Sequence, residues 1–327
     1  MFAETNIAVL GPIPRDKITS YQGETFEKFG CAVYTAVCLS ALVGSGSTIY
    51  TVSHVRKSDV GKVRELLSAF PHVDVSHVTD VADQGDVIDL TYVDQNRRDE
   101  KQTGFMNPIL PEDIEGLMHC DAFVFVPITD FEVPLETLRY IKANSKGTIV
   151  FDAHGPTNGV SKNGDRFHKF WIDRDRWLPN IDLLKMNLEE ARCSWFEGEY
   201  SLGALHEVSE LTMDELPNFA RHCLGLGVKA LYVTLDQHGC AVYFNDAAGR
   251  MREHLVKRVL VENVVDTTGC GDSFAGGLTF GYLATGDYVK ACQYGNCAGA
   301  QRCTSGELDV YFNREETERQ IAETYGD

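Results

Sequence analysis

The chain has 327 residues, of which 43% are hydrophobic, and its formal net charge is −18 at pH 7. This length predicts one or two α/β units with a large core, and an acidic chain without a basic stripe excludes nucleic acid as the main partner. No apolar run approaches the roughly 20 residues of a membrane span, the N-terminus lacks a signal-peptide pattern, and the ten scattered cysteines indicate reduced thiols, so we expect a soluble cytoplasmic protein with no membrane partner.

Predicted strands and helices alternate along most of the chain. Strands are expected at residues 6–11, 48–52, 122–126, 147–152, 181–185, 230–235 and 259–265, and helices at 32–42, 59–70, 135–144, 213–224 and from 273 onward. Because parallel strands are joined by crossover helices, this alternation predicts an α/β fold with a mainly parallel sheet covered on both sides. Two mixed segments, 16–23 and 85–95, do not fit the layers and resemble exposed strands; taken alone, they would be loops and hairpins.

The most informative segment is Asp266-Thr267-Thr268-Gly269-Cys270-Gly271-Asp272, which lies between the last predicted strand and the last predicted helices. Backbone N–H groups at a helix N-terminus favour an anion, and Gly269 and Gly271 would let a phosphate approach. Asp272 would repel that phosphate unless it has a separate task, such as accepting the proton of an attacking hydroxyl. Alone, Asp272 is equally explained as a helix cap.

This segment resembles the C-terminal signature of the ribokinase-like (PfkB) carbohydrate and nucleoside kinases. The resemblance implies a single kinase domain over residues 1–327, with a three-layer α/β/α core, a mainly parallel sheet and a small β-sheet lid formed by segments of about 14–25 and 85–106. It also implies that Gly269, Cys270 and Gly271 form an anion hole and that Asp272 is the catalytic base. Cys270 stands where the family usually has Ala.

The resemblance assigns the acceptor site to the N-terminal third. Asp16 matches an Asp that binds sugar hydroxyls, which suits an acceptor-only carboxylate. Gly30 and Ala36 match the family's Gly-Gly-x-x-x-Asn-x-Ala stretch, whereas Tyr34 replaces its Asn. Tyr34 could stack on a nucleoside base or pack into the core beside a simple sugar, so both acceptor classes stay open.

The donor site is assigned to the C-terminal half. Asn187 and Glu190 resemble the family's Asn-x-x-Glu motif, with Glu190 reaching Mg²⁺ through water; the same spacing is a common helix-capping pattern. Thr234 and Gly239 match the Thr-x-Gly-x-x-Gly nucleotide stretch, in which Asp236 replaces the first Gly. The resemblance further implies ATP as the donor, Asn296 in the segment beside the adenine or in simple helix packing, and a monovalent-cation (K⁺) site at Asp266.

Missing motifs disfavour other enzyme classes. The chain has no P-loop Gly-x-x-x-x-Gly-Lys-Ser/Thr, no Gly-x-Gly-x-x-Gly after its first strand and no Gly-x-Ser-x-Gly nucleophile elbow. The sequence therefore predicts an ATP-dependent kinase that phosphorylates a hydroxyl of a sugar or ribonucleoside. The alternative is a catalytically silent sensor of the same fold, and both a monomer and a homodimer are open.

Overall fold

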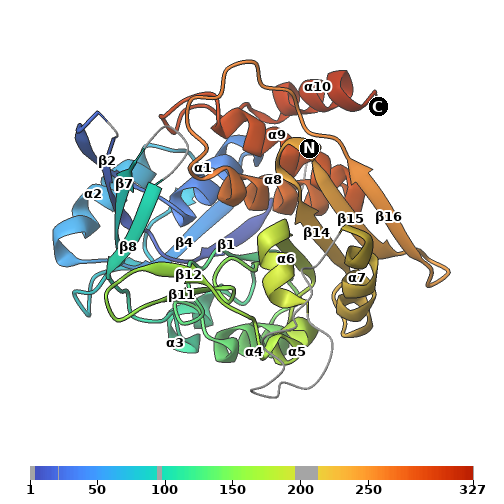
Figure 1. The fold of residues 1–327 in the computed structure, drawn as a ribbon, viewed down its shortest axis with the longest axis horizontal. Coiled ribbons are helices and arrows are strands. Elements are labelled where there is room, and N and C mark those ends of the chain that lie inside the picture. The colour runs from blue at the N-terminus through green and yellow to red at the C-terminus, as the bar shows by residue number, and fades with distance from the viewer. Residues whose placement is uncertain (1–3, 21, 94–97, 196–212, 327) are drawn as a thin grey trace.

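The computed structural model describes residues 4–20, 22–93, 98–195 and 213–326. Its main sheet has the strand order β16-β15-β14-β13-β10-β9-β1-β4-β5, with β6 also paired to β4. The strands from β14 through β5 run parallel, and β15 and β16 are antiparallel additions at one edge (Figure 1). The predicted mainly parallel α/β sheet is thereby confirmed.

The strands of the main sheet and a short hairpin have the following bounds. They are β1 (Asn6–Leu10), β4 (Thr48–His54), β5 (Val73–Asp74), β6 (Val78–Thr79), β9 (Ala122–Phe125), β10 (Thr148–Asp152), β13 (Leu183–Asn187), β14 (Ala230–Thr234), β15 (Cys240–Asn245) and β16 (Met251–Val256), with the hairpin β11 (Asn158–Val160) and β12 (Arg166–His168).

The α-helices form two layers, one on each side of the main sheet. The first layer comprises α1 (Ala32–Leu42), α2 (Lys57–Ser68), α8 (Cys270–Thr285), α9 (Tyr288–Arg302) and α10 (Arg314–Tyr325). The second layer comprises α3 (Pro111–Ile114), α4 (Leu135–Asn144), α5 (Arg174–Trp177), α6 (Leu188–Ser194) and α7 (Leu216–Gly225).

Alternation along the strands separates the two cores. In β1, Ile7 and Val9 pack into the core under α1 and α8, whereas Ala8 and Leu10 pack into the core on the other side. Successive side chains of a strand point to opposite faces, so a continuous apolar strand fills both cores at once. This arrangement is the predicted three-layer α/β/α architecture.

A second, smaller sheet lies at one end of the molecule, on the left in Figure 1. It has the order β3-β2-β7-β8, formed by β2 (Arg15–Thr19), β3 (Thr25–Phe29), β7 (Val87–Tyr92) and β8 (Arg98–Gly104). Strands β2 and β7 pair in parallel, while β3 and β8 are antiparallel edges. The mixed polar segments at 16–23 and 85–95 thus contain strands of one separate sheet, although positions 21 and 94–97 lie outside the described residues.

One predicted strand is wrong. Residues 259–265 form an irregular segment after β16, and Leu260, Val264 and Val265 are 78%, 55% and 58% exposed. The valine-rich composition favours an extended chain, but a strand also needs a neighbour with free backbone groups. Here Val265 N–H donates to Cys303 O at 2.8 Å, so the segment is anchored to the end of α9 instead of a sheet.

Other predicted elements agree with the structure to within a few residues. Helix α1 occupies the predicted 32–42, and it is buried nearly all round because it lies between the sheet and α8, as expected of a helix that is apolar on every side. The predicted helix at 213–224 begins as a 3₁₀ turn, Met213–Glu215, before α7. Among the described residues, no helix is long and apolar enough to cross a membrane.

Candidate active site

The glycine turn opens helix α8, as the sequence predicts. Gly269 precedes the first helical residue and has a φ of +82°, where a side chain would be strained. A Cβ on Gly269 would also lie 2.3 Å from Cδ2 of Tyr34, so the turn is packed directly against that ring. Among the expected anion-hole amides, the N–H of Cys270 already has a long bond of 3.3 Å to Thr267 O.

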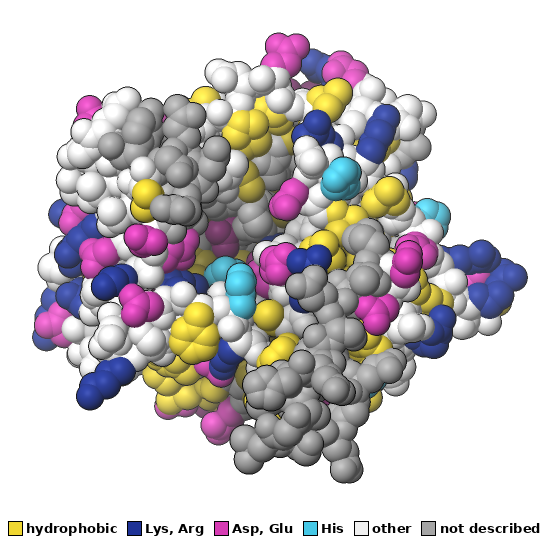
Figure 2. All heavy atoms as spheres, viewed as in Figure 1, with side chains coloured by type: hydrophobic (Ala, Val, Ile, Leu, Met, Phe, Trp, Pro, Cys, Tyr) yellow, Lys and Arg dark blue, Asp and Glu magenta, His cyan; other side chains and the backbone are white. Residues whose placement is uncertain are grey.

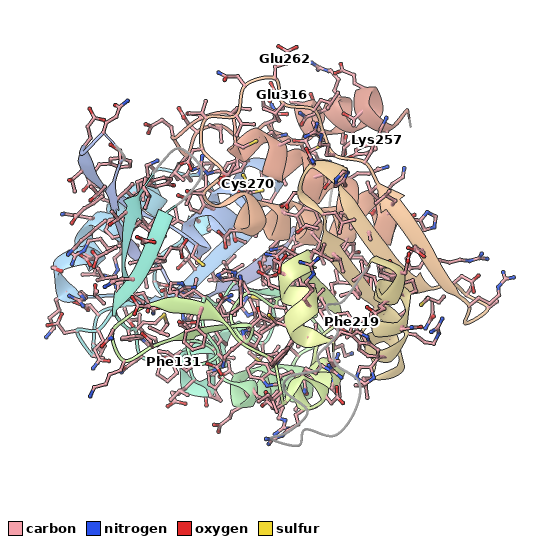
Figure 3. The ribbon with its side chains drawn as sticks, viewed as in Figure 1. Phe131, Phe219, Lys257, Glu262, Cys270 and Glu316 are labelled. Atoms are coloured by element: carbon pink, nitrogen blue, oxygen red, sulfur yellow. The ribbon has the colours of Figure 1, made fainter. Side chains whose placement is uncertain are left out.

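One pocket, of about 490 Å³, lies on one side of this turn. Among the predicted donor residues, its lining contains Asn187, Thr234, Gly239, Asn296, Cys270 and Gly271. Apolar side chains of Val259, Val261 and Phe274 form another part of the wall. Cys270, labelled in Figure 3, marks where α8 begins beside this pocket. The wall of the pocket therefore combines polar groups with apolar side chains.

A second pocket, of about 270 Å³, lies on the other side of the turn. Its lining brings together the predicted residues Asp16, Tyr34, Glu190, Asn187, Gly269, Gly271 and Asp272. The small sheet contributes Asp16, Ile88, Leu90 and Glu100, so β2, β7 and β8 form one wall. Figure 2 shows this face of the molecule hollowed, with acidic side chains gathered in and around the depression.

Lys185 connects the two pockets. It lines both, together with Asn187, Thr267 and Gly271. Its ammonium lies 2.7 Å from Asp152 Oδ2 and 3.0 Å from the position of a Cβ on Gly271. Burial alone would lower the pKa of Lys185, but the nearby Asp152, Glu190 and Asp272 raise it, so the side chain is a fixed cation beside the turn.

Asp272 is half-buried in the first turn of α8 and faces the smaller pocket. Burial raises the pKa of this carboxyl above its ordinary value, and the charges of Lys185 and His154 oppose that rise. Cys31 Sγ lies 3.6 Å from Asp272 Oδ1. A raised pKa brings a carboxylate closer to the range in which a general base works at neutral pH.

Asn187 and Glu190 form the capping pattern that their spacing allows. The Asn187 side chain accepts from the N–H of Glu190 at 2.8 Å, and Glu190 Oε2 accepts from the N–H of Asn187 at 2.7 Å. Glu190 Oε1 also accepts from Asn187 Nδ2 and lies 2.9 Å from His154 Nδ1. Burial would raise the pKa of Glu190, but the His154 contact and the Lys185 charge lower it to about 2. With both oxygens already engaged, Glu190 fits water-mediated contact with Mg²⁺ better than direct ligation.

The turn after β14 explains the substitution at position 236. Asp236 has a φ of +48°, the left-handed region that favours glycine, and Asp tolerates it better than most residues. Gly239 has a φ of +93°, and a Cβ there would lie 2.1 Å from Val256 O. Asn296 lines the larger pocket but donates to Lys257 O and to the Tyr325 hydroxyl, both at 3.1 Å. The packing interpretation of Asn296 is therefore the better supported one.

The predicted cation residue Asp266 has two side-chain cations as partners. Its Oδ2 lies 3.2 Å from Lys28 Nζ and 3.0 Å from Arg302 Nη2, and the Arg302 side chain is fully buried. Burial would raise the pKa of Asp266, but the hydrogen bonds from Thr268 and these cations lower it. The charge of this carboxylate is thus balanced from within the chain.

Tyr34 packs behind the glycine turn, and Gly30 lies beside Asp16. The Arg302 guanidinium stands 4.6 Å from the centre of the Tyr34 ring, and Tyr34 is only 2% exposed. Tyr34 therefore borders the smaller pocket without presenting a free aromatic face. A Cβ on Gly30 would lie 2.8 Å from Asp16 Oδ2, so glycine is needed for the approach of these two elements.

Four residues of this region with ionisable side chains were not predicted from the sequence. Lys185, His154 and Arg166 line the smaller pocket, and Arg302 supports the turn from behind. Lys185 could have been found from the sequence, because residues i and i+2 of a strand point to the same face and Lys185 precedes the predicted site residue Asn187 by two positions. Arg166 contacts Gln102 of the small sheet at 2.8 Å and His154 at 3.3 Å, pairings that only the folded chain creates.

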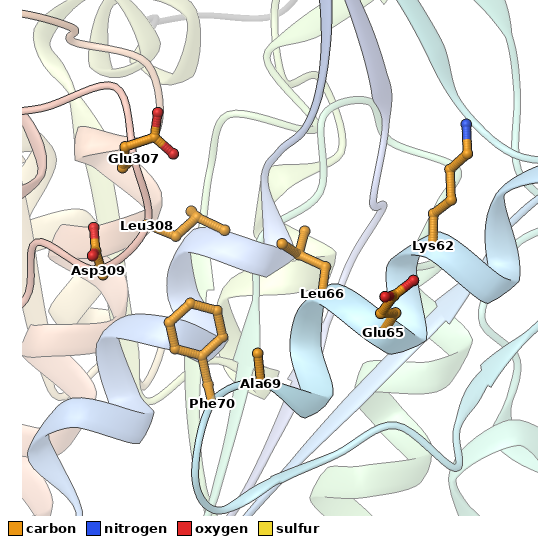
Figure 4. Close-up of a pocket in the computed structure, with 8 residues that line it drawn as sticks. All are labelled: Lys62, Glu65, Leu66, Ala69, Phe70, Glu307, Leu308 and Asp309. Carbon is orange, nitrogen blue, oxygen red and sulfur yellow. The ribbon is translucent and has the colours of Figure 1, made fainter.

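A third pocket, of about 550 Å³, lies away from the glycine turn, between α2 and the loop after α9 (Figure 4). Its lining consists of Lys62, Glu65, Leu66, Ala69, Phe70, Glu307, Leu308 and Asp309. It contains no residue of the glycine turn, so size alone does not identify the site. Among the described residues, no group of three or more His, Cys, Asp or Glu side chains could hold a metal ion.

Comparisons with known proteins bear on the family and the fold. A profile of the pfkB family carbohydrate kinases matches residues 165–310. An uncharacterized sugar kinase of Archaeoglobus fulgidus is 32% identical over 205 residues, which are 57% of this chain and 72% of that protein.

Solved structures share the fold at low sequence identity. Arabidopsis thaliana ribokinase complexed with ribose and ATP has a TM-score of 0.74 at 16% identity, over 98% of this chain and 99% of that chain. A pyrophosphate-dependent kinase of the ribokinase family, complexed with a pyrophosphate analog and myo-inositol, has a TM-score of 0.71 at 18% identity, over 96% and 99%. From the sugar-kinase relative, the matched profile and the shared fold together, we conclude that this chain belongs to the pfkB family of carbohydrate kinases.

Proposed function

We propose that this kinase transfers the γ-phosphoryl group of ATP to a hydroxyl of a small polyhydroxylated acceptor, a sugar or a ribonucleoside. The observation that carries the proposal is the meeting of two pockets at Gly271 and Lys185, with Asp272 on the smaller side. A donor and an acceptor bound in these pockets would have their reacting groups on opposite sides of one turn. Holding both reactants in this way is the main contribution a protein makes to phosphoryl transfer.

Features of the 490 Å³ pocket at the glycine turn support a nucleotide as donor. Its apolar side chains Val259, Val261 and Phe274 suit contact with a base, whereas the backbone N–H groups at the start of α8 suit phosphates. Pyrophosphate, the donor named for one solved relative, has no apolar group to contact these side chains. Mg²⁺, when bound with the nucleotide, supplies positive charge to the phosphates. Asn187 and Glu190 would help to hold it, as the family's Asn-x-x-Glu motif implies.

The residues of the chain have distinct tasks in this proposal. Asp272 accepts the proton of the attacking hydroxyl, and Lys185 stabilises negative charge that develops on the phosphoryl oxygens. Asp16 accepts hydrogen bonds from other acceptor hydroxyls. The small sheet acts as a lid over the acceptor, because β2, β7 and β8 line its pocket, and so limits the access of competing water.

Among acceptors, the position of Tyr34 supports a sugar or other polyol over a nucleoside. Arg302 lies against its ring, so Tyr34 is poorly placed to stack on a base. The ten free cysteines support the further proposal that the protein works in a reducing, cytoplasmic compartment.

The test is ADP release from ATP and Mg²⁺ over a panel of aldoses, ketoses, polyols and ribonucleosides, with wild type and Asp272→Asn side by side and pyrophosphate as an alternative donor. Acceptor-dependent ADP release that the variant loses would support the proposal and identify the acceptor class. Thermal stabilisation by an acceptor without release from any donor would instead support a catalytically silent sensor.

A further inference from the structure

One arginine side chain joins four segments of the chain at the smaller pocket of the glycine turn. Arg166 is the first residue of β12, and its side chain lines that pocket although it is only 7% exposed. Its Nη1 donates to Gln102 Oε1 of β8 at 2.8 Å, and its Nη2 donates to Ile128 O, after β9, at 3.0 Å. The same Nη2 lies 3.3 Å from His154 Nε2, after β10. The guanidinium therefore bridges the small sheet and the carboxyl ends of two strands of the main sheet.

The contact on the small sheet is itself fixed by further hydrogen bonds. Gln102 is 1% exposed, its Nε2 donates to Asp86 Oδ1 at 2.8 Å, and its backbone N–H donates to Gly164 O at 2.8 Å. Arg166 Nε also lies 3.5 Å from Oε2 of Glu100, which precedes Gln102 by two positions in β8. Because residues two apart in a strand point to the same face, Arg166 holds one face of β8 against the β11–β12 hairpin.

On its other side, Arg166 is connected to the residues around the glycine turn. His154 contacts Arg166 through Nε2, and its Nδ1 lies 2.9 Å from Glu190 Oε1. Glu190 and Asp272 line the same pocket as Arg166. The guanidinium thus lies between the small sheet, which it contacts directly, and the carboxylates of the candidate active site. A change in its position would alter how the small sheet sits over that site.

We propose that Arg166 is a positioning residue that holds the small sheet closed over the acceptor, so that the phosphoryl group passes to the acceptor and not to water. The inference rests on the proposed function, in which the small sheet is the lid of the acceptor pocket. A loosely attached lid admits water to the site. Water then attacks the γ-phosphorus, the bond to the bridging oxygen of ADP breaks, and ADP, inorganic phosphate and one proton are released.

The shape of the guanidinium, and not only its charge, carries this role. A guanidinium presents several donors in one plane and can serve Gln102 Oε1 and Ile128 O together, whereas an ammonium is a compact point charge. The charge has a separate effect, because burial raises the pKa of the Asp86 and Glu132 carboxyls and the Arg166 charge opposes both rises. The variant Arg166→Lys should therefore keep the charge near these buried carboxyls but lose the attachment of the lid.

The chain offers a matched control for this variant. The side chain of Arg174 is also 7% exposed, but it lines neither pocket at the glycine turn. Its Nε donates to Asp175 Oδ1 at 3.1 Å, and its Nη1 donates to Ser194 O. Arg174→Lys therefore removes a guanidinium of equal exposure, and keeps its charge, at a site away from the lid.

The first measurement is the amount of ADP released per acceptor phosphorylated in wild type, Arg166→Lys and Arg174→Lys, with an acceptor that the panel identifies. We expect wild type and Arg174→Lys to give nearly equal amounts of ADP and phosphorylated acceptor. In Arg166→Lys the ratio of ADP to phosphorylated acceptor should rise about threefold or more, because water competes with the acceptor. Loss of stability alone would not change this ratio. The same ratio in the two variants would overturn the proposal.

Hydrogen–deuterium exchange without any ligand tests the attachment of the small sheet by itself. The backbone amides of residues 99–104 in β8 should exchange faster in Arg166→Lys than in wild type, and at the wild-type rate in Arg174→Lys. Unchanged exchange of β8 in Arg166→Lys would contradict the role of Arg166. If the wild type phosphorylates no acceptor, the proposed function fails, whereas the exchange measurement still decides whether Arg166 holds the small sheet.

Discussion

Lys185 Nζ lies 2.7 Å from Asp152 Oδ2, and this ion pair stands at the junction of the two pockets. Both side chains are almost completely buried, Lys185 at 5% and Asp152 at 4% exposure. Burial raises the pKa of Asp152 to about 6 even with Lys185 beside it, so each charge depends on the other. The pair holds an ammonium at the glycine turn that the surrounding apolar core would otherwise reject.

Removal of one partner should therefore be more damaging than removal of both. We expect Lys185→Met to lower the free energy of unfolding by about 3–5 kcal/mol, because it leaves the buried Asp152 carboxylate without its counter-charge. Asp152→Asn combined with Lys185→Met should recover most of that loss. Urea unfolding of wild type, both single variants and the double variant at pH 7 measures the coupling, and strictly additive losses would contradict it.

Asp272→Asn should separate chemistry from binding. We expect turnover to fall at least about a hundredfold while nucleotide affinity stays close to that of wild type. Because burial raises the pKa of Asp272, the ionised form costs stability at neutral pH, and the variant should melt no lower than wild type. Asp309→Asn, an exposed carboxylate of the pocket in Figure 4, is the matched control. Near-normal turnover in Asp272→Asn would show that Asp272 is not the general base.

The same carboxyl sets the expected dependence of the rate on pH. In the proposed mechanism activity requires ionised Asp272, so it should be lost as the pH falls through the raised pKa, at a higher pH than the value of about 4 for an ordinary aspartate. The positive charge of Lys185 lowers this pKa, so Lys185→Met should move the acid limb of kcat/KM to still higher pH. A limb at the same pH in both proteins would show that another group controls it.

The turn itself can be tested with two glycines of similar backbone conformation. Gly269 has a φ of +82° and Gly286 a φ of +66°, but only Gly269 has a neighbour, the Tyr34 ring, at its Cβ position. We expect Gly286→Ala to cost about 1–2 kcal/mol from the left-handed backbone alone. Gly269→Ala should cost more and should also reduce turnover. Thermal unfolding and single-turnover rates compare the two, and equal effects would mean that the contact with Tyr34 is unimportant.

The partners of Asp266 predict how the enzyme responds to salts. Lys28 and Arg302 already neutralise this carboxylate, so activity should be the same in KCl, NaCl and choline chloride at equal ionic strength. Arg302→Met keeps most of the side-chain volume but removes the charge, and we expect it to gain a dependence on K⁺. Activation of the wild type by K⁺ alone would instead support the monovalent-cation site that the family resemblance implies.

Much of the fold and of the site could be predicted because local patterns carry them. Helix α1 and strand β1 follow directly from apolar runs bounded by glycine or polar residues, and the glycine turn before Asp272 is contiguous in sequence. Asp16 and Asp272 could be assigned to one site through the family resemblance, and both line the smaller pocket. The strand predicted at 259–265 was wrong, because composition indicates that a segment favours an extended backbone but not whether a partner strand exists beside it.

The sequence by itself determined the layered α/β core, the turn that opens α8 and the acidic residue that follows it, since each depends on periodicity or on neighbours in the chain. Only the tertiary structure decided which charges meet. Lys185 meets Asp152, and Arg302 meets Asp266 and Tyr34, although these partners lie far apart in the sequence. Such pairings depend on how the helices pack on the sheet and on burial, which makes an unpaired charge costly. Neither the packing nor the burial can be predicted from the local sequence pattern.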